Sequence, residues 1–166
     1  NMGDPIDEDT RLGPIARADL RDQLHQQVKR SLKKGAKRVM GGKIPKGKGF
    51  FYPATILTDV NKSCPAYHEE LFGPVASVFK VKNEEEAVRL ANDTNYGLGA
   101  AVFTQDLDRG ERLAREHLQA GACFVNEMVK SDPRLPFGGI KDSGFGRELA
   151  HYGLREFTNQ KTVYIK

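Results

Sequence analysis

Between residues 75 and 125 the chain alternates strand-like and helix-like segments, and this pattern limits the folds open to it. Apolar strand-like runs occupy residues 75–81, 98–104 and 122–125. Helical patterns begin between them at Asn83, which has Glu86 three residues later as in a capping box, and at Asp106. Strands separated by helices at this spacing predict right-handed βαβ crossovers, and therefore an α/β fold with a mostly parallel sheet.

An amphipathic helix is expected earlier in the chain, over residues 17–34. Apolar residues recur there every four positions and form a single stripe, and Gly35 follows as a helix-ending residue: Leu20, Leu24, Val28 and Leu32. The stripe predicts that the helix over residues 17–34 lies at the surface and packs on a core through one face.

A shorter helix is expected over residues 146–157.

The last segment, residues 158–165, alternates like a strand, but neither of its faces is strongly apolar. Such a terminal strand would present an exposed edge, and exposed edges are often covered by another chain. We interpret it as a strand that contacts another subunit, with a simple edge strand as the alternative. The domain boundaries that follow are residues 1–157 for the main body and 158–166 for the oligomerisation strand.

Length and composition exclude several classes of protein. The 166 residues contain no apolar run near the ~20 residues that span a bilayer, and no signal peptide is evident, so we expect a cytoplasmic protein without a membrane partner. The two cysteines and four histidines lack ligand spacing, so no metal is expected. Nine Lys or Arg lie between Lys29 and Lys48 without an acidic residue. No aromatic residues are interleaved with them, so a solvated face is favoured over a nucleic-acid site.

Two dense motifs carry the functional information. In the first, Glu69–Val75, Glu70 and Phe72 stand two positions apart before Gly73-Pro74, so both side chains point to the same face of an extended segment. The carboxylate can accept two hydroxyl hydrogen bonds, as a ribose offers, and the aromatic ring can pack on a flat ring. A surface Glu beside a core Phe is the alternative.

The second motif, Pro136–Glu148, contains four glycines, which allow positive φ or close approach of the backbone to another group. Phe137 precedes the first glycine pair and would be held by this loop. Asn126 ends a strand and begins the long loop that leads there, and ligands bind at the carboxyl ends of strands in open α/β sheets. A purely structural turn is the alternative.

These motifs resemble those of the NAD(P)-dependent aldehyde dehydrogenases, and more narrowly the succinate-semialdehyde dehydrogenases. The resemblance covers essentially the whole chain and is carried in order by residues 12–14, 49–54, 69–75, 91–92, 96–98, 101–104, 121, 125–126 and 136–148. It implies the three-layer αβα catalytic domain of that family, NAD or NADP as cofactor, and a homo-oligomer formed through the C-terminal strand.

The resemblance also implies roles for individual residues. Glu70 would bind the nicotinamide-ribose hydroxyls and Phe72 would pack beside the nicotinamide. Val129, Ser131 and Phe137 would line the substrate mouth, with Ser131 where semialdehyde-oxidising members grip the distal carboxylate through a hydroxyl.

The family forms a thiohemiacetal on a cysteine in a Gly-Gln-x-Cys segment, and this chain has no such segment. Cys64 and Cys123 are expected to be structural. The chain would then be the C-terminal part of the enzyme, inactive alone, with no catalytic residue of its own. The alternative is a non-catalytic binding or assembly module that retained the fold.

Overall fold

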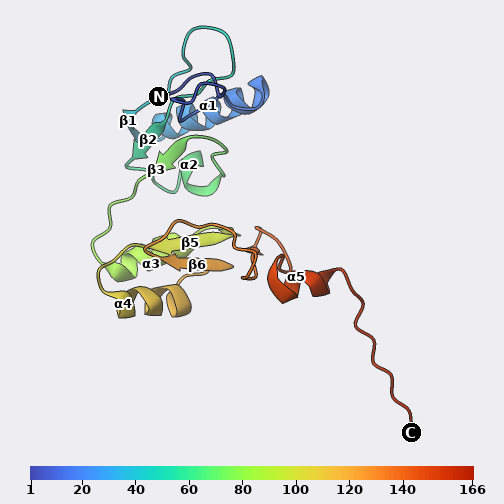
Figure 1. Ribbon diagram of the computed structural model, residues 1–166. Helices are drawn as coiled ribbons and strands as arrows, with labels where there is room; N and C mark the ends of the chain where they lie inside the picture. Colours follow the sequence, from blue (N-terminus) through green and yellow to red (C-terminus); the bar gives the residue numbers. More distant parts are fainter. The chain divides into compact units, whose positions relative to one another are not determined.

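A computed structural model describes residues 1–166, and these form two compact units, Asn1–Lys80 and Val81–Lys166. Figure 1 shows the helices and strands of each unit in chain order. Each unit combines helices with a small β-sheet, so the expectation of an α/β fold is confirmed.

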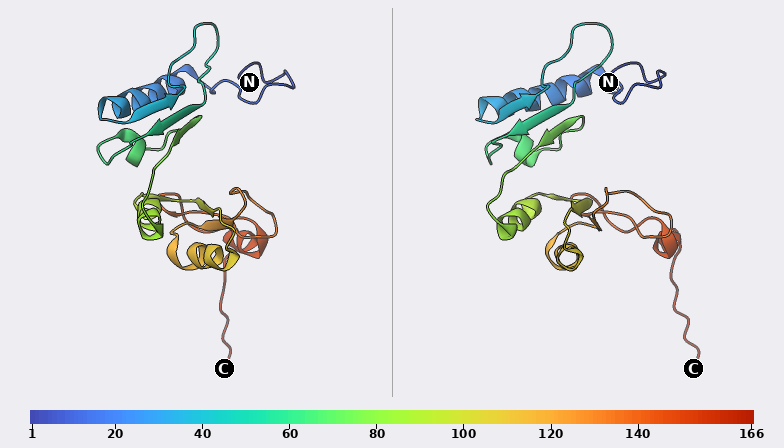
Figure 2. Two further views of the ribbon diagram at one scale, coloured as in Figure 1. Left: turned by 90° about the vertical axis from the view of Figure 1, so that its left-hand side faces the viewer. Right: turned by 60° about the vertical axis from the view of Figure 1, so that its left-hand side comes forward.

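The first unit packs two helices against a three-stranded sheet. Its elements are α1 (Ala18–Lys33), β1 (Lys37–Met40), β2 (Thr55–Thr58), α2 (Pro65–His68) and β3 (Val75–Ser77). The strand order is β1-β2-β3, with β1 antiparallel and β3 parallel to the central strand β2. In both views of Figure 2, α1 lies along the sheet.

The core of the first unit lies between α1, α2 and the sheet. Leu24 and Val28 of α1 meet Tyr52 and Leu57, and all four side chains are almost completely buried. Complete burial of one such large apolar side chain contributes about 1.5–3 kcal/mol. The apolar stripe predicted for residues 17–34 is therefore the packing face of α1, and Gly35 follows that helix with φ +104°.

The second unit is built on a parallel strand pair. Its elements are α3 (Glu84–Asn92), β4 (Tyr96–Gly97), β5 (Gly99–Val102), α4 (Leu107–Arg112), a π-helical segment η1 (Leu113–His117), β6 (Ala122–Val125), β7 (Ile140–Lys141) and α5 (Ala150–Glu156). Strands β5 and β6 are parallel and are connected through α4 and η1, which is one of the two βαβ crossovers that the sequence predicts. The other is absent, because β3 and β5 belong to different sheets. Strands β4 and β7 are antiparallel.

Two of the three helix starts predicted in this unit are confirmed by their side-chain caps, whereas the helix expected over residues 146–157 begins only at Ala150. The Asn83 side-chain oxygen accepts a hydrogen bond from the Glu86 N–H at 2.9 Å, and the Asp106 carboxylate accepts one from the Arg109 N–H at 3.0 Å. The Glu86 carboxylate reaches back as in a capping box but accepts the N–H of Lys82, the residue before the N-cap, at 2.7 Å. The helices begin where donors left free by helix geometry find partners.

One expectation about strands needs correction, and the strand expected to contact another subunit stays a prediction. The sheets are mixed rather than mostly parallel, because β1 and β2 are joined by a Gly- and Pro-containing loop, and strands joined without a crossover helix pair antiparallel. Residues 158–165 form no strand within the chain, and Figure 1 shows them as an extended tail after α5. An edge strand needs a neighbour, and these residues have none in the single chain. None of the helices has the length and apolar character that crossing a membrane requires.

Candidate functional site

Glu70 and Phe72 lie on the short connection between α2 and β3. Leu71, between them, is partly buried and packs on the core of the first unit. Glu70 is exposed, and Phe72 is 71% exposed, which is unusual for a large aromatic side chain. Leu71 is turned inward while Glu70 and Phe72 are exposed, so Phe72 is not a core residue. The segment turns at Phe72 instead of staying extended, because the Gly73 N–H donates to the Leu71 carbonyl at 2.7 Å.

Close packing on α1 holds this connection in place. A Cβ atom on Gly73 would lie 2.5 Å from Leu24 Cδ2, so only glycine lets the backbone approach the helix so closely. The next residue is fixed by the sheet, because the Pro74 carbonyl accepts a hydrogen bond from the Thr55 N–H at 2.8 Å. The residue pair after Phe72 therefore sets the direction in which the segment leaves the surface.

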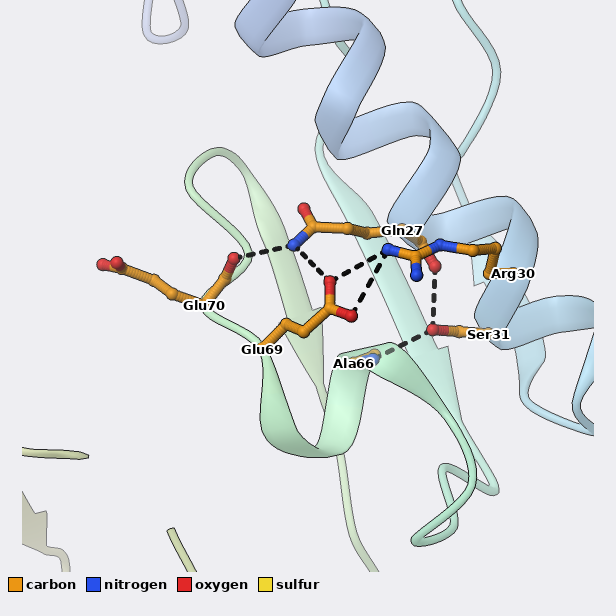
Figure 3. A network of polar contacts seen from close by, with 6 residues as sticks. All are labelled: Gln27, Arg30, Ser31, Ala66, Glu69 and Glu70. Carbon is orange, nitrogen blue, oxygen red and sulfur yellow. Dashed lines mark hydrogen bonds and ion pairs between the residues drawn. The ribbon is translucent and has the colours of Figure 1, made fainter. Parts of the chain in front are cut away.

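A network of polar side chains joins α1 to the same connection (Figure 3). Gln27 Nε2 donates to the Glu69 carboxylate at 2.9 Å and to the Glu70 carbonyl at 3.1 Å. Arg30 forms an ion pair with Glu69 at 3.0 Å. The Glu70 side chain takes no part in the network and extends away from it in Figure 3. Its carboxylate is thus available to a ligand.

Ser31 of α1 supplies the cap that α2 lacks. The Ser31 hydroxyl donates to the Gln27 carbonyl at 2.9 Å and accepts the Ala66 N–H at 3.0 Å, and Ser31 is completely buried. The N-cap residue of α2, Cys64, has no capping side chain. The donor that helix geometry leaves free at the start of α2 is therefore satisfied by α1, which positions the chain just before Glu69.

In the second unit, Val129 and Ser131 lie on the loop after β6. Val129 is 36% exposed and covers Gly99 of β5, where an added Cβ would lie 2.4 Å from Val129 Cγ1. Ser131 is exposed. The next residue, Asp132, accepts hydrogen bonds from the Arg134 side chain and backbone, and these hold the pKa of the Asp132 carboxyl well below its usual range. A charged, locally hydrogen-bonded turn therefore follows Ser131.

Phe137 is held by the glycine-rich loop that was predicted to carry it. Its backbone pairs with Glu148 in both directions, at 2.9 and 2.8 Å, and its side chain is half-buried. Arg147 Nη1 donates to the Gly139 carbonyl at 2.9 Å. A Cβ on Gly121 would lie 1.8 Å from the Gly138 carbonyl oxygen, so the loop lies directly on the backbone that leads into β6.

Asn126 closes the carboxyl end of the parallel strand pair. It has φ 56°, a left-handed conformation that asparagine tolerates better than most residues. Its side-chain oxygen accepts the Thr104 N–H at 2.8 Å, and its amide donates to the Thr104 carbonyl at 2.8 Å. The side chain thus replaces a missing strand partner and fixes the point at which the loop bearing Val129 and Ser131 begins.

Neither cysteine has the environment of a nucleophile. Cys64 is completely buried in the core of the first unit. Burial raises the pKa of the Cys123 thiol, which disfavours the reactive thiolate. No group of three or more His, Cys, Asp or Glu side chains within residues 1–166 is arranged to hold a metal ion.

The predicted site residues therefore fall into two groups. Glu70 and Phe72 lie together in the first unit, while Val129, Ser131 and Phe137 lie on one loop system of the second. The roles predicted for both groups stay predictions. An exposed carboxylate such as that of Glu70 can accept hydrogen bonds from hydroxyl groups, and an exposed ring such as that of Phe72 can pack on a flat ring.

Sequence reasoning missed the role of Gln27. One signal was present, because Gln27 falls three residues after Leu24 and just before Val28, on the apolar stripe of α1. A polar residue on a buried helix face needs a buried partner. The partner itself, 42 positions away in the sequence, could not be identified from the sequence.

Comparisons with known proteins identify the family to which this chain belongs. The pattern that defines the aldehyde dehydrogenase family matches residues 1–163. The chain is 53% identical over 161 residues to a succinate-semialdehyde dehydrogenase [NADP(+)] of Deinococcus radiodurans, covering 97% of this chain and 34% of that protein. It is 48% identical over 163 residues to a succinate semialdehyde dehydrogenase [NAD(P)+] of Escherichia coli, covering 98% of this chain and 35% of that protein.

Solved structures agree. The crystal structure of succinic semialdehyde dehydrogenase from Streptococcus pyogenes in complex with NADP+ matches with a TM-score of 0.94 and 41% identity, over 99% of this chain and 36% of that one. An aldehyde dehydrogenase of Mycobacterium tuberculosis complexed with NAD+ matches with a TM-score of 0.93 and 35% identity, over 99% and 34%. This chain spans about a third of the length of the relatives it matches.

Proposed function

Because this chain belongs to the aldehyde dehydrogenase family, we propose that it forms part of an NAD(P)-dependent enzyme that oxidises succinate semialdehyde to the carboxylic acid. The observation that carries the proposal is identity of 48–53% to relatives named for this substrate, over nearly the whole chain. On this proposal residues 1–157 form part of a three-layer αβα catalytic domain. Residues 158–166 form the strand through which the protein assembles into a homo-oligomer.

Within this enzyme, Glu70 and Phe72 hold the cofactor. The exposed Glu70 carboxylate accepts hydrogen bonds from the two hydroxyls of the nicotinamide ribose, and the Phe72 ring packs beside the nicotinamide. The bound cofactor supplies an acceptor for hydride. The two side chains orient it, since binding groups that fix the reacting geometry lower the barrier to reaction.

Val129, Ser131 and Phe137 form the mouth through which the aldehyde enters. Phe137 and Val129 provide apolar walls, and the exposed Ser131 hydroxyl donates a hydrogen bond to the distal carboxylate of the substrate. A hydrogen bond to a charged group is worth about 1.5–3 kcal/mol, or roughly 10- to 100-fold in affinity. Ser131 therefore favours a semialdehyde acid over an uncharged aldehyde.

The nucleophile belongs to another part of the protein on this proposal. A buried Cys64 and a Cys123 thiol with a raised pKa are unsuited to attack a carbonyl carbon. The thiolate that forms the thiohemiacetal is supplied by a Gly-Gln-x-Cys segment outside these 166 residues. The 166-residue chain alone is therefore inactive.

The test compares the product of the complete gene with this chain alone. Each is assayed with succinate semialdehyde and NAD+ or NADP+ by the absorbance of the reduced cofactor. We expect turnover from the gene product and none from the chain. Turnover by the chain alone would refute the assigned division of roles, and an inactive gene product would favour a non-catalytic assembly module.

Substrate choice is tested with the variant Ser131→Ala in the gene product. We expect KM for succinate semialdehyde to rise about 10-fold or more, because the carboxylate loses its donor. KM for an uncharged aliphatic aldehyde of similar length serves as the control and should hardly change. An equal rise for both aldehydes would remove Ser131 from carboxylate recognition.

A further inference from the structure

Gln27 is a buried polar residue on the packing face of α1. It is only 5% exposed, and its neighbours along the packing face of α1 include Leu24 and Val28. Burial of an amide is unfavourable unless the amide is hydrogen-bonded. The Gln27 amide therefore needs hydrogen-bond partners within the core.

The two partners of the Gln27 amide are adjacent residues on the connection that carries Glu70. Nε2 lies 2.9 Å from a Glu69 carboxylate oxygen and 3.1 Å from the Glu70 carbonyl oxygen. An amide nitrogen has two N–H donors, so one side chain satisfies both acceptors. Gln27 thereby links the side chain of one glutamate to the backbone of the next.

The carboxylates of the neighbouring residues Glu69 and Glu70 therefore differ, because one is bound within the chain and the other is free. Glu69 is engaged by Gln27 and by Arg30, whose Nη2 lies 3.0 and 3.3 Å from its carboxylate oxygens. Glu70 has its backbone held and its carboxylate free, and Figure 3 shows that carboxylate extending away from α1. The network thus decides which of the two carboxylates faces outward.

The anchor continues into buried structure on both sides. Ser31, one turn after Gln27, accepts its hydrogen bond from Ala66 and so ties α1 to the helix that precedes Glu69. After Phe72, Gly73 packs within contact of Leu24. Between these two fixed points, Gln27 is the residue that binds the Glu70 backbone.

We propose that Gln27 is a positioning residue for the cofactor: it holds the Glu70 backbone and occupies Glu69, so that the Glu70 carboxylate meets the ribose. The inference rests on the proposed function, in which Glu70 binds the ribose hydroxyls. Loss of the two hydrogen bonds lets the connection between α2 and β3 adopt several conformations. Cofactor binding then has to select the one conformation that binds, which weakens the apparent affinity.

The experiment uses calorimetry to measure the dissociation constants of NAD+ and NADP+ for the product of the complete gene. The cofactor that binds more tightly is then used to compare the variants. Gln27→Leu removes both donors at similar volume, and Gln26→Leu is the matched control, because Gln26 is exposed on the same helix. Glu70→Gln tests the underlying site. Gln27→Lys restores a donor of similar reach.

We expect Gln27→Leu to weaken cofactor binding about 10-fold, as loss of a hydrogen-bonded anchor does. Gln26→Leu should change it less than about 2-fold, and Gln27→Lys should recover much of the loss. The calorimetric stoichiometry should stay the same in all three, because a general loss of folded protein lowers the number of binding sites, whereas loss of positioning raises the dissociation constant.

Three results would overturn the inference. If Glu70→Gln weakens binding while Gln27→Leu does not, or if Gln26→Leu weakens it equally, Gln27 has no positioning role and the proposed function stands. If Glu70→Gln leaves cofactor binding unchanged, both the inference and the assigned role of Glu70 fail.

Discussion

Substitution of Gly73 by alanine tests whether close packing on α1 sets the course of the Glu70–Phe72 segment. The new Cβ would lie 2.5 Å from Leu24 Cδ2 and 3.5 Å from Ile15 Cδ1. Leu24 is only 1% exposed, so its side chain has no open space into which it can rotate. Overpacking of this kind costs about 1–3 kcal/mol.

The double variant Gly73→Ala, Leu24→Ala makes the prediction quantitative. Leu24→Ala alone removes buried methyl groups and leaves a cavity, at a cost of about 2–5 kcal/mol. In the double variant the alanine at position 73 extends into that space. The double variant should therefore lose less stability than the sum of the losses of the two single variants, and the difference should be about 0.5–3 kcal/mol.

Native-state hydrogen exchange of amides in α1 and β2 gives the free energy of opening for this core in each variant. Gly13→Ala is the matched control, because its added Cβ would meet only Pro5 Cβ at 3.7 Å. It should change the opening free energy by less than about 0.5 kcal/mol. If the losses from Gly73→Ala and Leu24→Ala simply add, the steric explanation for Gly73 is wrong.

Three further predictions concern the second unit. Asn126→Ala should lower the opening free energy of β5 and β6 amides by about 1–3 kcal/mol, because both hydrogen bonds to Thr104 are lost; an unchanged exchange rate would contradict this. Native Cys123 should react with iodoacetamide at neutral pH more slowly than a cysteine in an unfolded peptide, since burial raises its pKa, and mass spectrometry would reveal equal rates. Hydrogen bonds from Arg109 and, to a smaller extent, Arg112 lower the pKa of the Glu84 carboxyl. Its contribution to stability is therefore present above the pKa of the unfolded chain and is lost as the pH falls through the pKa of the folded chain. Glu84→Gln should remove this pH dependence from hydrogen exchange of the α3 amides.

Local signals made the helices predictable. The four-residue repeat of α1 and the caps Asn83 and Asp106 are encoded within a few residues, and each helix begins within one residue of its signal. The exposure of Phe72 was left open by the sequence, which allowed a core Phe as the alternative.

Long-range pairing could not be predicted in the same way. Strand direction depends on which segments meet, and the antiparallel pairs β1–β2 and β4–β7 leave no local mark in the sequence. Residues 158–165 have strand-like alternation but no partner within the chain. The positive φ of Asn126 and the partners of Gln27 likewise depend on tertiary structure.

The central proposal is that Glu70 binds the nicotinamide ribose and Ser131 binds the substrate carboxylate in the complete protein. A crystal structure of the complete gene product with NADP+ and succinate semialdehyde tests it most directly. The account predicts the Glu70 carboxylate within hydrogen-bond distance of the nicotinamide-ribose hydroxyls and the Ser131 hydroxyl within the same distance of the substrate carboxylate. A Glu70 carboxylate far from the ribose hydroxyls, or a Ser131 hydroxyl far from the substrate carboxylate, would contradict it.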